Sequence, residues 1–170
     1  YGDGSGVRGD IIGDTQHHGG NDKAIYAYAR EELDYWQSEL SRPLASGCFG
    51  ENLTTQGVDL SALLINQRLR IGTAVLEVSV PRQPCSTFAG WLGERGWLKR
   101  WTARGDCGTY LRIISPGRIQ PGDSITMDTP PNHDITMRIA FAAKMGNRTL
   151  AQRVIEAGCL PAHQHNNLRT

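Results

Sequence analysis

The fold is decided by residues 74–85, which read Ala74-Val75-Leu76-Glu77-Val78-Ser79-Val80-Pro81-Arg82-Gln83-Pro84-Cys85. Apolar residues alternate with mostly polar ones in the first part of this stretch, at Ala74, Leu76, Val78 and Val80. This period of two is typical of a strand with one buried face. Pro81 ends the pattern, because proline has no N–H to donate to a β-ladder. Residues 68–80 therefore give the clearest strand signal in the chain, with a turn or kink at 71–73.

Shorter strands are predicted on both sides of this stretch, at 52–55, 109–115 and 124–127. The chain contains 20 Gly and 8 Pro, which are dispersed along it, so turns are frequent. Short strands joined by such turns favour a closed or nearly closed barrel, because closure removes exposed sheet edges. We therefore expect a mainly β fold with peripheral helices, of the α+β class.

The remaining elements are predicted from the helical spacing of apolar residues. Residues 23–40 are expected to form one helix, and residues 88–101 one or two short helices. Pro130-Pro131 marks a boundary. Beyond it, two small helices are expected at 134–141 and 149–157, before a polar tail.

The composition limits the classes of function. The chain has 170 residues, of which 39% are hydrophobic and 21% charged, as in one soluble globular domain. A net charge of +1 provides no field for nucleic acid or an anionic membrane. No apolar run approaches the ~20 residues that cross a bilayer, and no signal peptide is recognised. We expect a cytoplasmic protein that binds neither nucleic acid nor membrane. Because the chain opens at Tyr1, we expect its natural N-terminus to lie upstream.

Four cysteines stand far apart, at positions 48, 85, 107 and 159, without the paired spacing of a zinc site. Cys85 is the strongest candidate for chemistry, because the prolines before it stiffen the backbone. Arg82 lies three residues earlier and would favour the thiolate, the form that a soft metal or a sulfur-transfer reaction requires. The alternative is a buried, inert cysteine. The other three, Cys48, Cys107 and Cys159, are interpreted as structural or incidental.

A second candidate is the corner His17-His18-Gly19-Gly20, with Lys23 close behind. Adjacent glycines let a ligand approach the backbone. The helix expected after them would favour an anion such as phosphate at its N-terminus. The alternative is a histidine that only hydrogen-bonds a loop, and the residues alone favour this alternative.

Several other residues allow two interpretations each. Asp10 and Asp14 could bind a metal, but aspartate beside glycine more often stabilises a turn. Asn52 could donate to a polar ligand or satisfy a buried backbone group. The tryptophans could wall a pocket, although helical spacing favours packing, at Trp91, Trp97 and Trp101.

Five blocks of sequence together resemble the signatures of the MOSC domain family, in that family's order and spacing. They are Gly9-Asp10 with Asp14 and His17 to Tyr28, then Gly47 to Thr55, Pro81 to Cys85, Gly108 to Arg112, and Pro121 to Asp123. Each block is weak alone, but five in register are specific. The resemblance extends over about residues 6–127 and points to the stand-alone bacterial branch of YiiM type.

The resemblance implies a barrel-like domain over 1–129, without the family's first strand, and a helical C-terminal extension over 130–170. It implies a molybdenum cofactor of molybdopterin type, with Cys85 as metal ligand and catalytic residue. Contacts to the cofactor would come from Arg82, Asn52, His18, Gly19, Gly20 and Lys23. The family is also associated with pyridoxal phosphate binding.

Two functions follow from the resemblance. The first is the reduction of small N-hydroxylated compounds, such as N-hydroxylated purines. Because the extension lacks the cysteines of an iron–sulfur module, the electrons would come from a separate donor protein. The second is a sulfur carrier, in which Cys85 holds a persulfide and no small molecule is turned over. A binding module without remaining chemistry is a third interpretation.

Overall fold

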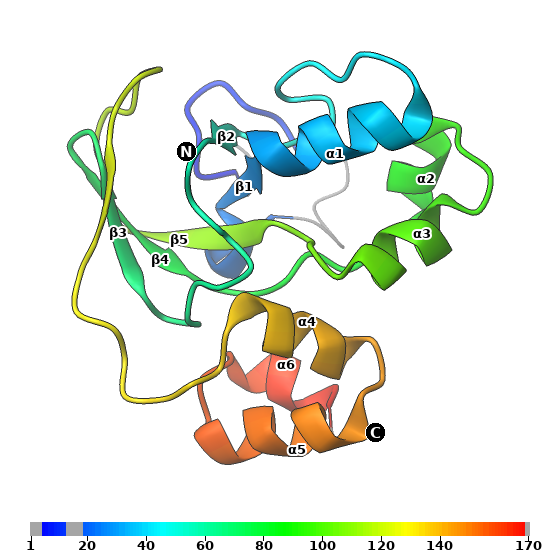
Figure 1. The fold of residues 1–170 in the computed structure, drawn as a ribbon. Coiled ribbons are helices and arrows are strands. Elements are labelled where there is room, and N and C mark those ends of the chain that lie inside the picture. The colour runs from blue at the N-terminus through cyan, green and yellow to red at the C-terminus, as the bar shows by residue number, and fades with distance from the viewer. Residues whose placement is uncertain (1–4, 13–18, 169–170) are drawn as a thin grey trace.

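A computed structural model describes residues 5–12 and 19–168. Its centre is one six-stranded sheet in the order β2-β1-β5-β4-β3-β6. The strands are β1 (Ile25–Ala29), β2 (Leu53–Thr55), β3 (Arg68–Ile71), β4 (Ala74–Val78), β5 (Thr109–Ser115) and β6 (Ile125–Met127). Neighbouring strands are antiparallel, except for the parallel pair β1 and β2. The sheet curls into a half-barrel with β2 and β6 at its edges (Figure 1), which confirms the expected α+β fold.

The β3–β4 hairpin occupies the stretch with the clearest strand signal. Buried and half-buried residues alternate along β4, as the sequence pattern predicts. Pairing with β5 continues beyond β4, because Ser79 N donates to Tyr110 O (2.9 Å) and Tyr110 N donates to Val80 O (3.1 Å). The segment Pro81 to Cys85 therefore leaves the sheet directly beside β5.

β1 corrects the prediction of a single helix over residues 23–40. Asn21–Lys23 form a short 3-10 turn (η1), Ile25–Ala29 form a strand, and helix α1 spans Arg30–Leu40. All five residues of β1 are buried, so both faces of the strand are covered. Such a strand shows no alternation of polar and apolar residues, and spacing alone cannot distinguish it from a buried helix.

Three helices lie together on one side of the sheet: α1, α2 (Ser86–Leu92) and α3 (Trp97–Arg104) (Figure 1). Aromatic rings fill the space between them. Trp36 and Trp97 are 4.5 Å apart, and Phe88 lies 5.4 Å from Trp97, all with edge-on geometry. Trp97 and Trp101 are fully buried, as their helical spacing indicated, whereas Trp91 is 77% exposed.

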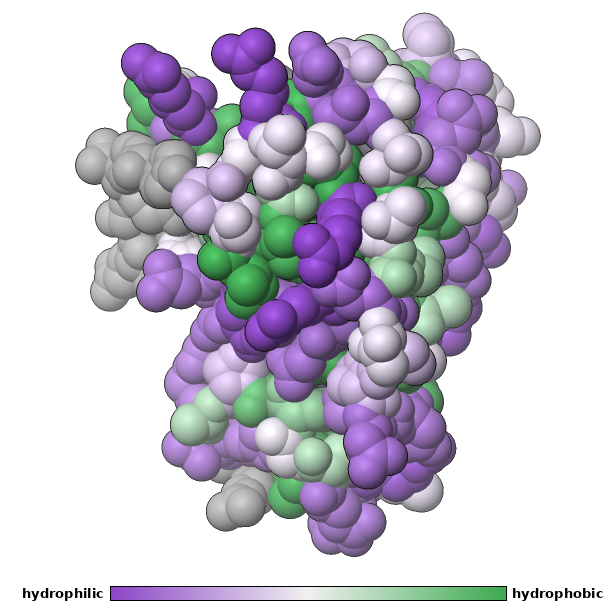
Figure 2. Space-filling view, turned by 90° about the vertical axis from the view of Figure 1, so that its left-hand side faces the viewer, coloured by the Kyte–Doolittle hydropathy of each residue, from purple (hydrophilic) through white to green (hydrophobic). Residues whose placement is uncertain are grey.

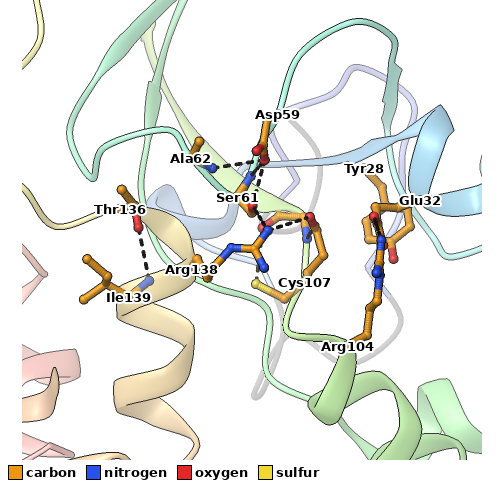
Figure 3. Close-up of polar contacts among 12 residues, drawn as sticks. Tyr28, Glu32, Asp59, Ser61, Ala62, Arg104, Cys107, Thr136, Arg138 and Ile139 are labelled. Carbon is orange, nitrogen blue, oxygen red and sulfur yellow. Dashed lines mark hydrogen bonds and ion pairs between the residues drawn. The ribbon is translucent and has the colours of Figure 1, made fainter. Parts of the chain in front are cut away.

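The C-terminal helices α4 (Met137–Lys144), α5 (Arg148–Ala157) and α6 (Ala162–Asn166) gather away from the first three (Figure 1). The start of α4 is tied to the segment before β3, where Met137 N donates to Leu63 O (2.8 Å) and Arg138 N to Ser61 O (2.9 Å). Figure 3 shows the Arg138 side chain reaching toward Ser61, whose hydroxyl it binds at 2.6 Å. These contacts fix the extension against the sheet body.

Polar and charged side chains cover most of one face of the molecule (Figure 2). The face in Figure 2 is mostly hydrophilic, with apolar side chains gathered near the centre of its upper part. Among the described residues, no helix is both long enough and apolar enough to traverse a bilayer.

Candidate functional site

Cys85 lies where the chain turns from the β4 extension into α2. Its backbone is extended (φ −135°), and its thiol sulfur accepts a hydrogen bond from Phe88 N at 3.4 Å, so that Cys85 is the N-cap of α2. The side chain is half-buried and faces a pocket. The approach through Pro81 and Pro84 thus places the thiol at the edge of the core, where it lines the pocket.

Arg82 is clamped beside this thiol. Its guanidinium lies between the rings of Tyr26 (4.6 Å) and Phe88 (4.2 Å) and donates to the Phe49 carbonyl. Burial lowers the pKa of the guanidinium, but Tyr26, Tyr110 and Cys85 offset this effect, and the net shift is upward. Arg82 is therefore a fixed positive charge within electrostatic range of Cys85.

The pocket that joins these two residues has a volume of about 460 Å³. Its polar lining includes Asn52, Lys23 and Gly19 as well as Arg82 and Cys85. Its aromatic lining comes from Tyr26, Phe88, Trp91 and Tyr110. The volume lies within the range of small-molecule and cofactor sites, and such sites combine apolar walls with a few convergent polar groups.

Asn52 connects two walls of the pocket. Its side-chain oxygen accepts from Tyr26 N (2.9 Å), and its side-chain nitrogen donates to the Asp10 carboxylate (3.1 Å). Asp10 also accepts from the Ser5 hydroxyl at 2.7 Å. Asn52 therefore satisfies a backbone group, and Asp10 holds the N-terminal segment in place.

The glycine corner lies at the pocket rim without the helix that was expected after it. Gly20 precedes the η1 turn, in which Lys23 N donates to Gly20 O at 2.9 Å, and β1 follows. The expectation of an anion at a helix N-terminus is therefore wrong here. The Lys23 ammonium instead lies over the Tyr110 ring, 5.9 Å from its centre. His17, His18 and Asp14 lie outside the described residues.

The other thiols lie outside the pocket lining. Burial raises the pKa of Cys107, Cys159 and Cys48. Cys107 and Cys159 are buried in the core. Within the described part of the chain, no group of three or more His, Cys, Asp or Glu residues could hold a metal ion.

Sequence reasoning missed most of the aromatic lining. Tyr110 reaches the pocket from β5, and Phe88 and Trp91 reach it from α2. Burial raises the pKa of the Tyr110 phenol, which therefore stays a neutral hydrogen-bond donor at neutral pH. Trp91 and Ile11, both more than three-quarters exposed, form apolar parts of the rim. The signals in the sequence were the positions of Tyr26 and Tyr110 inside two of the five blocks, and Trp91 was considered as a pocket wall, whereas Phe88 gave none.

Fold and site together define an α+β half-barrel protein with a thiol and a fixed guanidinium in one pocket. The model of the MOSC domain family matches residues 14–126. The chain therefore belongs to the MOSC domain family.

Three relatives extend this result. The chain is 36% identical to the uncharacterized protein YflK of Bacillus subtilis (strain 168), covering 89% of this chain and 70% of YflK. It is 31% identical to the protein YiiM of Escherichia coli (strain K12), covering 81% of this chain and 62% of YiiM. It is also 31% identical to a protein of Gibberella moniliformis (strain M3125 / FGSC 7600) named reductase, covering 72% of this chain but only 22% of that protein.

A solved structure agrees with the sequence relatives. The crystal structure of YiiM from Geobacillus stearothermophilus matches with a TM-score of 0.78 at 28% identity, covering 88% of this chain and 78% of that chain. The expected stand-alone bacterial branch is thereby confirmed.

Proposed function

We propose that this protein binds a molybdenum cofactor of molybdopterin type in the Cys85 pocket and reduces small N-hydroxylated compounds. One observation carries the proposal: a half-exposed thiol and a fixed guanidinium share a pocket of about 460 Å³. The thiol provides the soft donor that a thiophilic metal takes. The guanidinium provides a permanent charge for an anionic group.

The residues around the pocket fit such a cofactor in two further ways. Gly47 and Gly50 line the pocket, and the position that a Cβ would occupy on either residue is open, with no neighbouring heavy atom within 4 Å. A ligand can therefore come close to the backbone there. Lys23 adds a second cation to the lining, which suits the phosphate of a pterin cofactor.

Each side chain has a defined task in the proposed reaction. When bound, the cofactor supplies the two-electron redox change. Cys85 holds the metal, and Arg82 and Lys23 hold the anionic group. The neutral Tyr110 phenol can donate a hydrogen bond to the oxygen of a bound N–OH group. Phe88 and Trp91 provide the apolar side of the pocket.

The overall reaction must balance in electrons and protons. One N-hydroxylated molecule, two electrons and two protons give one amine and one water as the N–O bond breaks. We propose that a separate electron-donor protein supplies the electrons. The relative named reductase supports a reductive direction.

Elemental analysis tests this proposal. The protein is purified from a molybdenum-replete host, its molybdenum and pterin contents are measured, and a hydroxylaminopurine is offered with dithionite as reductant. We expect close to one molybdenum per chain and the release of the corresponding amine. A fully folded protein without molybdenum or pterin would overturn the proposal.

A sulfur carrier is the second candidate, and the N-cap contact of Cys85 favours it. The Phe88 N–H points at the sulfur and would stabilise a thiolate or persulfide there. A persulfide donor would transfer its outer sulfur to the Cys85 thiolate and retain a thiol. Intact-protein mass spectrometry would then show about 32 Da added at Cys85, removable by a thiol reductant. Absence of the added mass after incubation with a persulfide donor would exclude this function.

A further inference from the structure

One guanidinium connects four parts of the chain behind the pocket. Arg112, on β5, donates to Asp22 in η1 (2.5 Å) and to Glu77 on β4 (2.6 Å). It also donates to the side-chain oxygen of Asn66, in the segment before β3, at 3.1 Å. The side chain of Arg112 is 20% exposed, so these contacts are partly shielded from water. Arg112 lies two residues beyond Tyr110, a residue of the pocket lining.

The contact with Asp22 acts on the pocket rim. Asp22 is the middle residue of η1, the rim residue Lys23 is its last residue, and the rim residue Gly19 lies two positions before its start. A backbone hydrogen bond from Lys23 N to Gly20 O closes the turn, and no side-chain hydrogen bond caps its start. A single 3-10 turn is not stable by itself, because one hydrogen bond does not offset the ordering of several residues. The pair Asp22–Arg112 is therefore a main tertiary contact of the turn.

The contact with Asn66 leads to the C-terminal helices. Asn66 has a positive φ of 66°, which its backbone bond to Val78 O (2.8 Å) helps to hold. Its side-chain nitrogen donates to the Cys159 carbonyl, just beyond α5, at 2.8 Å. The charge of the rim residue Lys23 also acts on one of these helices. Burial, followed by the charge of Lys23, lowers the pKa of Lys144 in α4 to about 8.

From these contacts we infer that Arg112 is a positioning residue, which holds the Gly19 to Lys23 rim at the pocket and couples it to the C-terminal helices. The purpose of this role rests on the proposed function, because Arg112 would keep Lys23 beside the anionic group of the cofactor. Arg112 itself is not one of the residues that line the pocket. The planar fork of arginine is needed to reach three acceptors at once, and lysine cannot reproduce it.

Arg70 offers a matched control. It forms a two-pronged ion pair with Asp128 (2.8 and 3.0 Å) between β3 and β6, away from the pocket lining. Arg70→Ala and Arg112→Ala thus each remove one arginine from one antiparallel strand of the same sheet. Only Arg112 contacts η1.

The first experiment measures amide hydrogen exchange of Lys23 by NMR in the full chain. We expect exchange at Lys23 to become about tenfold faster in Arg112→Ala and in Asp22→Asn, and to change less than about twofold in Arg70→Ala. Arg112→Lys should restore only part of the protection. Asp22→Asn keeps the test available if Arg112→Ala fails to fold, because this substitution removes the charge of Asp22 and preserves the shape of its side chain.

The outcomes separate the inference from the function. Unchanged exchange at Lys23 in Asp22→Asn, or equal acceleration in Asp22→Asn and Arg70→Ala, would overturn the positioning role. Faster exchange at Lys23 in a protein that never contains molybdenum would leave the positioning role standing and refute the proposed cofactor. If both hold, Asp22→Asn should carry several-fold less molybdenum per chain than Arg70→Ala, at equal activity per bound metal.

Discussion

The Arg82 guanidinium lies 4.6 Å from the centre of the Tyr26 ring and 4.2 Å from that of Phe88. A planar cation between two rings gains both charge–quadrupole attraction and stacking area. The same group donates to the Phe49 carbonyl, which joins the loop before β2 to the strand that leads to Cys85. Arg82 therefore contributes both to the charge of the pocket and to the packing of its walls.

Arg82→Lys should separate these two contributions. The ammonium keeps the charge but loses the planar contact with both rings, so we expect a loss of about 1–2 kcal/mol in the free energy of unfolding. Urea denaturation measures it. Arg100→Lys is the control, because Arg100 lies at the surface and its guanidinium is 5.7 Å from the centre of the Trp36 ring. This substitution should lower the free energy of unfolding by less than about 0.5 kcal/mol. Equal losses in the two variants would argue against the clamp.

Cys85→Ala should abolish the proposed reduction without unfolding the protein. The substitution removes the sulfur that would hold the metal, and with it only one weak N-cap contact worth less than about 1 kcal/mol. We expect the rate with a hydroxylaminopurine and dithionite to fall by more than about 100-fold. Circular dichroism and thermal unfolding should stay close to those of the unsubstituted protein.

Cys107→Ser is the control for the thiol. Cys107 is 1% exposed and its side chain is not part of the pocket lining. The new hydroxyl should cost about 1 kcal/mol of stability and leave turnover nearly unchanged. Full activity of Cys85→Ala with bound cofactor, or loss of activity in a folded Cys107→Ser, would mean that the wrong thiol had been chosen.

The fold could be predicted where the local pattern and the environment agree. The strand at 109–115 was predicted with its observed bounds, because turns flank a run in which buried and half-buried residues alternate at the start. Residues 25–29 were assigned to a helix, because β1 is buried on both faces and its neighbours in the sheet, β2 and β5, are distant in the chain. Such burial is a tertiary property that no local window contains.

The site could be predicted only where its residues are neighbours in the chain. Cys85 and Arg82 are three residues apart, so their proximity was visible in the sequence. Tyr110 and Trp91 reach the same pocket from β5 and α2, and the pairing of β5 with the β4 extension decides this. The resemblance to MOSC proteins supplied what spacing could not, namely that Asn52, Gly19 and Lys23 belong to the same site as Cys85.

Gly108→Ala should be strongly destabilising. Gly108 has φ +65°, and a Cβ there would collide with the Ala27 carbonyl and the Tyr26 hydroxyl, next to the pocket wall. Both effects together should cost more than about 2 kcal/mol of unfolding free energy. Gly122→Ala is the control, because Gly122 has φ +91° but open space around the Cβ position. Its cost should be about 1 kcal/mol, from conformation alone. Similar losses in both variants would show that the close approach of β1 does not matter.

Asp106 should make stability depend on pH. Burial, followed by repulsion from Glu32, raises the pKa of its carboxyl above the usual value of 3.8, although Gly108 N and Arg138 partly oppose the shift. Figure 3 shows Arg138 approaching this region from α4, and its guanidinium lies 3.9 Å from the Asp106 carboxylate. A raised pKa in the folded state means that the folded protein binds the proton more tightly than the unfolded chain. The stabilising contribution of the protonated carboxyl is therefore fully present below pH 3.8 and is lost as pH rises through the folded pKa.

Asp106→Asn should remove this loss, because the amide stays neutral and its oxygen can still accept from Gly108 N. We expect the variant to gain stability relative to the unsubstituted protein as pH rises from about 4 to 7, and to match it near pH 4. Urea unfolding at several pH values measures the difference. Asp128→Asn should show the opposite trend, because the bond to Arg70 lowers the pKa of that exposed carboxyl. A stability difference between Asp106→Asn and the unsubstituted protein that did not change with pH would contradict this prediction. The charged Asp106 carboxylate would then cost the folded state nothing, which would require Arg138, at 3.9 Å, to neutralise it fully.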